Sequence, residues 1–227
     1  MRWPGIVIAG VVAVAALLQP ESEPVIAQTD PLINVTYFVS ATDTRFFRFV
    51  AEITNPTSVT LEGIQTRWDG LDSSGAIVGS STKKHPPLTA GATYFYVGGA
   101  GVANLSGSPQ TVQVTLTNPG SPSNAPSRFL AVTDVALSKM AFSLYQGLDD
   151  YNVSAVLSVD AEPINRLDMT TTYVLRDQYG VIVGADFNSS VRNLPDQLVS
   201  GTPYRLEERV GATGPAVSAD VAAYRRP

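Results

Sequence analysis

Two stretches of the chain share a pattern whose carboxylates could bind a cation. Residues 68–79 read WDGLDSSGAIVG and residues 173–184 read YVLRDQYGVIVG, so Asp72 and Asp177 each open an Asp-x-x-Gly-x-Ile-Val-Gly run. A calcium ion needs several converging oxygen ligands, whereas each loop offers one obligatory carboxylate. Aspartate at the first position and glycine at the fourth are preferred in type I turns. The pattern therefore predicts two hairpin turns rather than two metal sites.

The remaining chemically reactive residues are few. The chain has no cysteine and a single histidine, His85, which excludes disulfides, thiolate chemistry and histidine-based metal clusters. His85 lies in the stretch KKHPP, and because no nucleophile motif accompanies it, we expect a surface residue without a catalytic role. The adjacent acids Asp149 and Asp150 in GLDDYN predict a solvated loop, with a calcium site as the alternative. We therefore expect no catalytic residue, no metal site and no cofactor.

The composition indicates a folded protein that is rich in strands. The 227 residues are 44% hydrophobic and 15% charged, which suffices for a packed core and argues against disorder of the whole chain. Serine, threonine, valine and glycine are abundant, a balance that favours strands over helices. The net charge is −5 and the basic residues are dispersed. The chain thus lacks the basic footprint that nucleic-acid binding requires.

The first twenty residues, MRWPGIVIAGVVAVAALLQP, predict a membrane segment. Arg2 precedes an apolar run from Trp3 to Leu18, and acids follow at Glu21 and Glu23. This charge pattern places the N-terminus in the cytoplasm and the rest of the chain outside it. Residues 3–20 would extend ~27 Å as a helix, which is at the low edge of what crosses a bilayer. We expect a single-pass protein of the bacterial inner membrane, with the remainder periplasmic or extracellular.

Two interpretations of this segment stay open. If it is a retained anchor, Gly5, Ala9 and Ala13 share one helix face, and small residues at that spacing let another membrane helix pack closely. If it is a secretory signal, the small-residue rule allows cleavage after Ala27, and the mature protein is secreted or periplasmic. In both cases residues 21–31 are expected to form a linker.

After residue 33, apolar and polar residues alternate as they do in half-buried strands. The stretches TVQVTLT (111–117) and NVSAVLSV (152–159) follow this pattern. The stretch RFFRFVAEIT (45–54) follows it as well, with Val50 as the apolar exception on its polar face. The apolar face of that stretch is formed by Phe47, Phe49, Ala51 and Ile53. No stretch after Leu18 sustains a helical period, so the predicted fold class is all-β.

The chain contains one unit twice. At an offset of 105 residues, Trp68 aligns with Tyr173 and the two Asp-x-x-Gly-x-Ile-Val-Gly runs coincide. Residues 118–127, NPGSPSNAPS, have the composition of a linker. Each unit is then the size of an immunoglobulin-like sandwich, with roughly seven short strands. We predict two tandem immunoglobulin-like antiparallel β-sandwiches after one N-terminal hydrophobic helix, with the bounds 1–20 (anchor or signal), 21–31 (linker), 32–118 (first sandwich), 119–128 (linker) and 129–227 (second sandwich).

The second unit resembles a known family. Its stretch YVLRD (173–177) is similar to the aromatic-x-Leu-Tyr-Asp signature of FxLYD-type domains, with Arg176 in place of the tyrosine. A D-x-x-G-x-v-v hairpin and an L-x-x-G corner follow in that family, and both units keep these parts. The first unit retains only the aromatic residue and the aspartate of the signature. The resemblance, over most of residues 45–98 and 150–210, implies a β-sandwich on an exported bacterial protein and no transferable catalytic residues.

Neighbouring aromatic residues are candidates for a protein interface. A strand buries only alternate positions on one face, so a run such as Tyr94-Phe95-Tyr96 directs at least one ring outward. Aromatic residues on an outer face are enriched at protein interfaces. The candidate contacts with a partner are Phe46, Tyr94, Phe95, Tyr96, Phe142 and Tyr145. Coverage of these rings by the other unit is the equally open alternative.

The sequence as a whole predicts binding rather than catalysis. The first hypothesis is a membrane-tethered, non-enzymatic accessory subunit on the outer face of a larger membrane complex, of respiratory or photosynthetic type, with other subunits as partners. The second hypothesis is a cleaved periplasmic or secreted module that binds a ligand, a carbohydrate or a protein. An enzyme is the third hypothesis, and its activity would depend on His85 or on the pair Asp149-Asp150.

Overall fold

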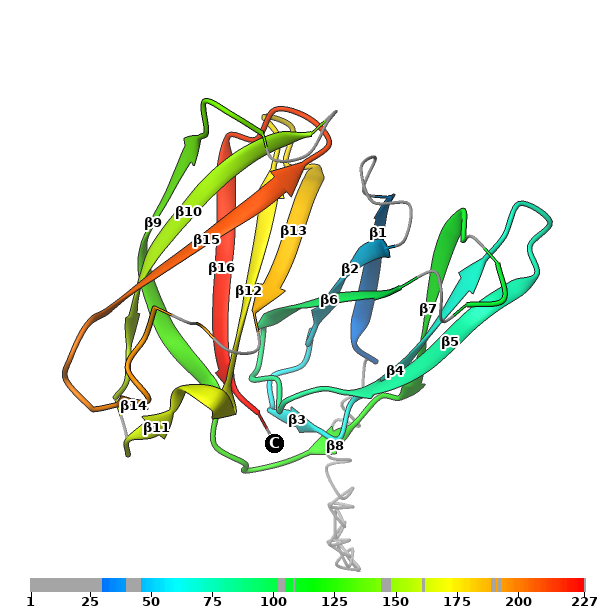
Figure 1. Ribbon diagram of the computed structural model, residues 1–227. Helices are drawn as coiled ribbons and strands as arrows, with labels where there is room; N and C mark the ends of the chain where they lie inside the picture. The colour runs from blue at the N-terminus through cyan, green and yellow to red at the C-terminus, as the bar shows by residue number, and fades with distance from the viewer. Residues whose placement is uncertain are drawn as a thin grey trace, which may run out of the picture.

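The computed structural model describes residues 30–39, 46–101, 105–107, 109–143, 148–160, 162–188, 191 and 193–226 (Figure 1). These residues form sixteen strands and one 3-10 helix, Arg166–Asp168, which confirms the all-β prediction. The predicted membrane segment, with Gly5, Ala9 and Ala13, lies outside the described residues. Within the described ranges, no helix has the length and apolar character needed to span a membrane.

The N-terminal half, residues 30–122, contains three sheets. In the first, β2 (Phe46–Thr54) lies between β1 (Leu32–Val39) and β6 (Thr93–Gly101). In the second, β4 (Gln65–Leu71) lies between β5 (Ile77–Lys84) and β7 (Thr111–Asn118). The third is a pair of two-residue strands, β3 (Leu61–Glu62) and β8 (Ser121–Pro122). All of these pairings are antiparallel.

The C-terminal half, residues 129–226, contains a six-stranded sheet and a two-stranded one. The order of the large sheet is β13-β12-β16-β9-β10-β15. Its strands are β9 (Phe129–Lys139), β10 (Asp149–Ser158), β12 (Met169–Arg176), β13 (Ile182–Asn188), β15 (Tyr204–Ala212) and β16 (Ser218–Arg225). The small sheet pairs β11 (Ile164–Asn165) with β14 (Gln197–Leu198).

The two halves repeat the same order of strand pairing. The sheet β1-β2-β6 corresponds to β9-β10-β15, and the sheet β5-β4-β7 corresponds to β13-β12-β16. The isolated bridge between Leu61 and Leu88 corresponds to the pairing of Ile164 with Leu198. The halves differ in one respect that concerns both layers: in the C-terminal half, β9 joins them. Its first two residues pair with β16 and the rest pair with β10.

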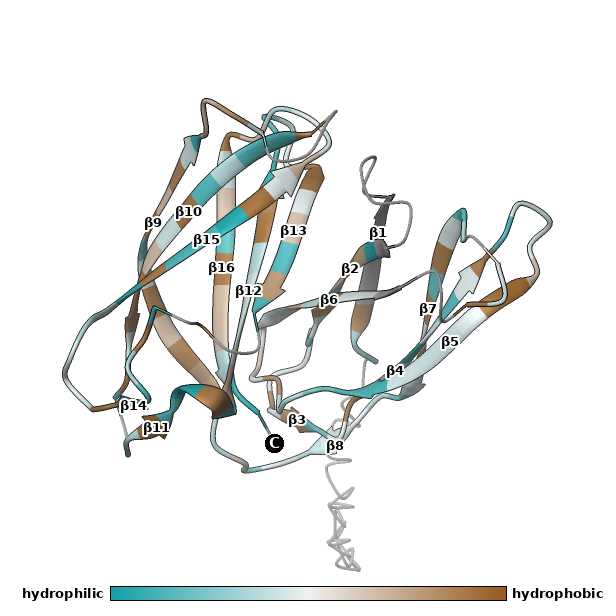
Figure 2. Cartoon of the chain, in the orientation of Figure 1, coloured by the Kyte–Doolittle hydropathy of each residue, from teal (hydrophilic) through white to brown (hydrophobic). Residues whose placement is uncertain are grey.

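Each half buries its core between two facing layers of strands, which in the C-terminal half belong to one continuous sheet. In the N-terminal half, Phe49 of β2 packs against Trp68 of β4, with the ring centroids 5.9 Å apart. In the C-terminal half, the equivalent strands bring Val153 of β10 against Tyr173 of β12. Trp68 and Tyr173, which the repeat aligns, are therefore both core residues. The alternation of apolar and polar residues along β10 is visible as colour stripes (Figure 2).

Close approach of the backbone explains one glycine in the C-terminal layers. A Cβ atom on Gly184 of β13 would lie 2.3 Å from the carbonyl oxygen of Gly211 in β15, which is far inside any normal contact. The edge strands of the two layers thus approach each other through glycine, and a side chain at Gly184 would force them apart.

The halves pack against each other through the outer faces of two sheets. Val50 and Val97, from β2 and β6, form one apolar cluster with Val174, Ile182 and Ala185, from β12 and β13. Because Phe49 and Ala51 of the same strand face the N-terminal core, both faces of β2 are buried. The one valine on the polar face of RFFRFVAEIT is thereby explained: it faces the other half of the chain.

The predicted linker, residues 119–128, is held by hydrogen bonds near both of its ends. Strand β8 pairs with β3, and the Ser123 amide donates to the Thr60 carbonyl over 2.9 Å. At the other end, the Arg225 amide of β16 donates to the Arg128 carbonyl over 2.9 Å. The segment therefore connects the halves along a defined path.

Candidate functional site

The two Asp-x-x-Gly stretches form hairpin turns, as the sequence predicts. The Asp72 carboxylate accepts from the Ser74 amide over 2.8 Å, and the Asp177 carboxylate accepts from the Tyr179 amide over 2.9 Å. Gly75 and Gly180 have φ values of 83° and 79°, which favour glycine. Hydrogen bonds from the Ser74 hydroxyl and from turn amides hold the pKa of Asp72 below its usual value. Both aspartates thus stabilise their hairpin turns by accepting hydrogen bonds from turn amides.

The prediction for Asp149 and Asp150 is corrected by the structure. Both residues belong to strand β10, because its pairing with β15 extends to Asp149 opposite Ala212. The side chain of Asp150 is fully buried and accepts two hydrogen bonds from the Arg209 guanidinium, one of them 2.7 Å long. Asp149 pairs with Lys139 at 2.7 Å. In the described part of the chain, no group of three His, Asp or Glu side chains is arranged to hold a metal ion.

His85 is also placed differently from the prediction, because it is only 3% exposed. Its Nε2 lies 2.7 Å from the Thr66 hydroxyl, and its ring packs against the rings of Tyr94 and Tyr96. Nδ1 has no hydrogen-bond partner among the described residues. Burial, together with the nearby charge of Lys83, lowers the pKa of His85 to about 4. The expected surface position of His85 is therefore wrong, because Thr66 and the two tyrosine rings enclose its side chain.

The rings of Tyr94 and Tyr96 point to the inner side of β6. Tyr94 is only 1% exposed, and its hydroxyl donates to the Tyr224 hydroxyl of the C-terminal half over 2.9 Å. Tyr96 packs edge-on against Phe49, and burial raises its pKa to about 12. Neither ring is presented to a separate protein in this structure.

Phe95 lies on the outer side of β6 and is covered by the C-terminal half. The Arg176 guanidinium lies 5.6 Å from the centre of its ring. For the run Tyr94-Phe95-Tyr96, coverage by the other half is thus what the structure shows. The side chain of Phe46 and the whole of Tyr145 lie outside the described residues, whereas Phe142 is 84% exposed.

Arg176 is the central polar residue of the junction. It donates to Glu52 across the junction over 2.5 Å and to Asp220 of β16 over 2.7 Å. Partial burial lowers the pKa of its guanidinium, but the hydrogen bonds to Asp220 and Glu52 outweigh this, and the net pKa lies above its usual value. A second ion pair joins Arg48 of β2 to Asp186 of β13. Arg176 and Arg48 therefore both join the two halves by ion pairs.

Replacing Arg176 with methionine is expected to lower the free energy of unfolding by about 1–3 kcal/mol. The substitution removes a donor shared by Glu52 and Asp220 and keeps an apolar stem beside Phe95. Urea denaturation would measure the loss. The control is Arg67→Met, which removes an exposed pair with Asp69 and is expected to cost less than ~1 kcal/mol. Equal losses in the two variants would contradict the role given to Arg176.

Exposed apolar side chains gather at one end of the C-terminal half. Phe142 in the β9–β10 loop, Tyr179 in the β12–β13 turn and Val217 in the β15–β16 loop are 84%, 80% and 62% exposed. Val181, beside the same turn, is also exposed. We call these four residues the loop-end cluster. Sequence reasoning found only Phe142, although an aromatic residue inside a polar turn, as in DQYG, is itself a signal.

Hydrogen bonds hold the three loops at the same end. The Val217 amide donates to the Arg176 carbonyl, at the end of β12, over 2.8 Å. The Arg209 guanidinium, which binds Asp150, also donates to the Phe142 carbonyl over 3.0 Å. In Figure 1 these loops lie at the top of the C-terminal half, whereas the lower end of β1 and the C-terminus lie toward the bottom.

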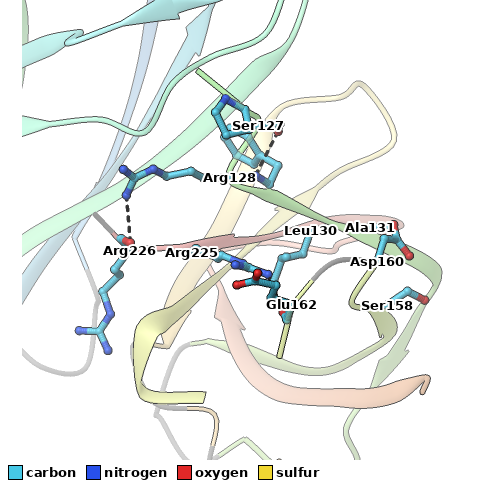
Figure 3. Close-up of a pocket in the computed structure, with 11 residues that line it drawn as sticks. Ser127, Arg128, Leu130, Ala131, Ser158, Asp160, Glu162, Arg225 and Arg226 are labelled. Carbon is cyan, nitrogen blue, oxygen red and sulfur yellow. Dashed lines mark hydrogen bonds between the residues drawn. The ribbon is translucent and has the colours of Figure 1, made fainter. Parts of the chain in front are cut away.

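The structure has a pocket of about 570 Å³ beside the start of β9 and the end of β16, lined in part by Arg128, Arg225, Arg226 and Glu162 (Figure 3). Its arginines do not converge on one point. The Arg128 guanidinium donates to the Arg226 carbonyl over 3.1 Å, and that of Arg225 donates to the Glu162 carbonyl over 2.8 Å. These guanidinium groups bind neighbouring chain segments. The bond from Arg128 joins the end of the linker to the residue that follows β16.

Comparisons with known proteins leave the family open. No family model matches the chain, and no curated protein matches it. Among solved structures, a transglutaminase from red sea bream aligns with 10% identity and a TM-score of 0.28. The alignment covers 86% of this chain, which spans only 28% of the length of that enzyme. At this level the likeness carries no argument about the fold or activity of the present chain.

Proposed function

We propose that the chain is a non-catalytic binding protein that stands on the outer side of a bacterial inner membrane, as an accessory subunit of a larger membrane complex. In this proposal its two halves are immunoglobulin-like sandwiches related to FxLYD-type domains, and the apolar segment within residues 1–20 is the tether. The repeated pairing order supports the sandwich interpretation, since both halves have two antiparallel three-stranded layers in the same order of pairing.

The loop-end cluster is the observation that carries the proposal. Phe142, Tyr179, Val181 and Val217 expose large apolar surfaces from three loops at one end of the C-terminal half. Aromatic residues are enriched at the cores of protein interfaces, and loops at the ends of sandwiches are common binding sites. We infer that this end contacts another subunit.

The fixed junction supports a scaffolding role. The buried cluster around Val50 and Val174, and the ion pair between Arg176 and Glu52, hold the halves in one relative orientation. A tether before residue 30 and a contact at the loop end would then be separated by a stiff body rather than by a flexible linker. Such a body sets the distance between the membrane and the contact.

A co-purification experiment tests the proposal. The tagged full chain is expressed in its native host and extracted in mild detergent, and the variant Tyr179→Ser is compared with Ile77→Ser. Ile77 is also exposed beside a hairpin turn, but in the N-terminal half, so it is a matched control. We expect Tyr179→Ser to reduce the co-purified subunits about tenfold or more, as loss of an interface anchor does. Recovery of the wild-type chain free of other subunits would sink the proposal.

The alternative is a cleaved periplasmic or secreted module. The intact mass of the protein distinguishes this module from the anchored chain. Cleavage after Ala27 gives a chain that begins at Gln28, whereas an anchored chain keeps the apolar segment. Mass spectrometry of the protein recovered from membrane and periplasmic fractions distinguishes the two.

A further inference from the structure

A second, smaller pocket of about 240 Å³ lies where the halves meet. Strands β5 and β6 of the N-terminal half contribute Lys83 and Tyr96 to its walls. The C-terminal half contributes Thr172, Phe187 and Tyr224, from three strands of one sheet, and Arg226, which follows β16. We call it the junction pocket. Since a water molecule occupies ~30 Å³ in the liquid, the volume corresponds to about eight waters, enough for a small organic molecule.

The floor of the junction pocket is rich in hydroxyl groups. Thr172 is 2% exposed, and its hydroxyl has no hydrogen-bond partner among the described residues. A buried hydroxyl without a partner is costly and rare in native proteins, so it calls for an explanation. The Tyr224 hydroxyl accepts a hydrogen bond from the Tyr94 hydroxyl over 2.9 Å, so its own O–H can donate to a ligand. Thr170 adds a further hydroxyl from the same face of β12.

The backbone of β6 borders the pocket on the N-terminal side. Strand β6 is an edge strand of its sheet, so the side of β6 that faces away from β2 pairs with no other described strand. Gly98 and Gly99 lie at this edge and have no side chains to cover the main chain. At Gly98 a side chain is excluded by the core, because a Cβ atom would lie 2.3 Å from the Phe49 ring. Main-chain groups of an open edge strand can bind a ligand.

The rim of the pocket is positively charged. Lys83, from the N-terminal half, and Arg226, from the C-terminal half, both line it, and no Asp or Glu residue is among the described residues that do. Lys83 forms no ion pair with a described residue and lies close enough to His85 to lower its pKa. Two cations facing a pocket without carboxylates favour an anion.

We propose that the junction pocket binds a hydroxylated anion of monosaccharide size, such as a sugar acid or a sugar phosphate. The hydroxyls of Thr172 and Tyr224 form hydrogen bonds with the hydroxyls of the ligand, and the ring of Phe187 covers one face of the ligand. Lys83 and Arg226 bind its negative charge. Because the two cations come from different halves, the bound anion joins both halves. The proposal does not depend on the loop-end cluster or on the membrane tether.

Isothermal titration calorimetry of the full chain in detergent micelles tests the proposal, with D-glucuronate, glucose 6-phosphate, D-glucose and acetate as separate probes. We expect saturable binding of at least one of the two sugar anions, and at least about tenfold weaker binding of glucose and of acetate. The glucuronate and glucose 6-phosphate arms distinguish a carboxylate ligand from a phosphate ligand. Equal binding of all four probes, or saturable binding of neither sugar anion, would overturn the proposal.

Two pairs of variants locate the binding site. Lys83→Met is expected to weaken binding of the sugar anion about tenfold, whereas Lys84→Met, on the next residue and outside the pocket, leaves it unchanged. Thr172→Val keeps the shape of the side chain and removes the hydroxyl that lacks a partner. It is expected to weaken binding several-fold without loss of stability, which a merely structural role for Thr172 would not produce. Equal effects of Lys83→Met and Lys84→Met would place the ligand elsewhere and reject the site.

Discussion

Replacing Arg209 with leucine is expected to lower the free energy of unfolding by about 3–5 kcal/mol. Arg209 is the cation that binds the fully buried carboxylate of Asp150, and leucine cannot supply either hydrogen bond. The folded state must then keep a buried carboxylate without its guanidinium partner, which costs free energy. Chemical denaturation at neutral pH would measure the loss.

The control for this variant lies on the same strand. Arg205 of β15 pairs with Glu207, but the Arg205 side chain is 72% exposed, so Arg205→Leu is expected to cost less than ~1 kcal/mol. In the Arg209→Leu background, Asp150→Asn removes the buried charge and should recover part of the stability. The account of Asp150 as a buried ion-pair partner would be wrong if Arg209→Leu were as mild as Arg205→Leu.

The second large effect concerns pH and the buried histidine. His85 has a pKa of about 4 in the folded protein, against 6.5 for an unperturbed histidine, because burial and the charge of Lys83 disfavour its protonated form. Each tenfold change in proton affinity is worth ~1.36 kcal/mol, so the gap amounts to about 3 kcal/mol. This stability is present above pH 6.5, where both states are neutral at His85, and it is lost as the pH falls toward 4.

A variant that cannot titrate isolates the contribution of His85. Glutamine at this position keeps a hydrogen-bonding group near Thr66 and carries no proton in this pH range. We expect the free energy of unfolding to fall between pH 7 and pH 4 in both proteins. The fall in the wild-type protein is expected to exceed the fall in His85→Gln by about 3 kcal/mol. The same fall in both proteins would show that other groups account for the pH dependence.

Local patterns in the sequence predicted the strands and turns because their causes are local. Alternation in NVSAVLSV placed Val153, Ala155 and Leu157 in the core, where the structure has them. The spacing of Asp177 and Gly180 predicted the turn, since both residues act within it. These features depend on a few neighbouring residues, and the repeat doubled the evidence for each.

The errors concern residues whose environment is set by distant parts of the chain. The expected solvated loop at Asp150 is wrong because the side chain is buried against its cation, Arg209, which is 59 residues away in the sequence. The expected surface position of His85 is wrong because Tyr94 and Tyr96, which cover its ring, lie on another strand. Neither neighbour can be read from the sequence beside the residue.

The junction between the halves shows the same limit at a larger scale. Alternation required an outward ring in Tyr94-Phe95-Tyr96, but it did not indicate what would cover that ring. The structure places Phe95 under Arg176, which is 81 positions further along the chain. The candidate site in the junction pocket was missed for this reason, since its walls come from both halves of the chain.

The contact between Tyr94 and Tyr224 has a consequence for how the protein is made. Tyr224 and Phe129 pack into the core of the N-terminal half, yet Tyr224 belongs to β16, which follows all the other strands that the structure describes. When the chain is synthesised or exported from its N-terminus, the core of the N-terminal half stays incomplete until β16 has emerged. We expect the nascent N-terminal half to stay sensitive to proteases until β16 has emerged.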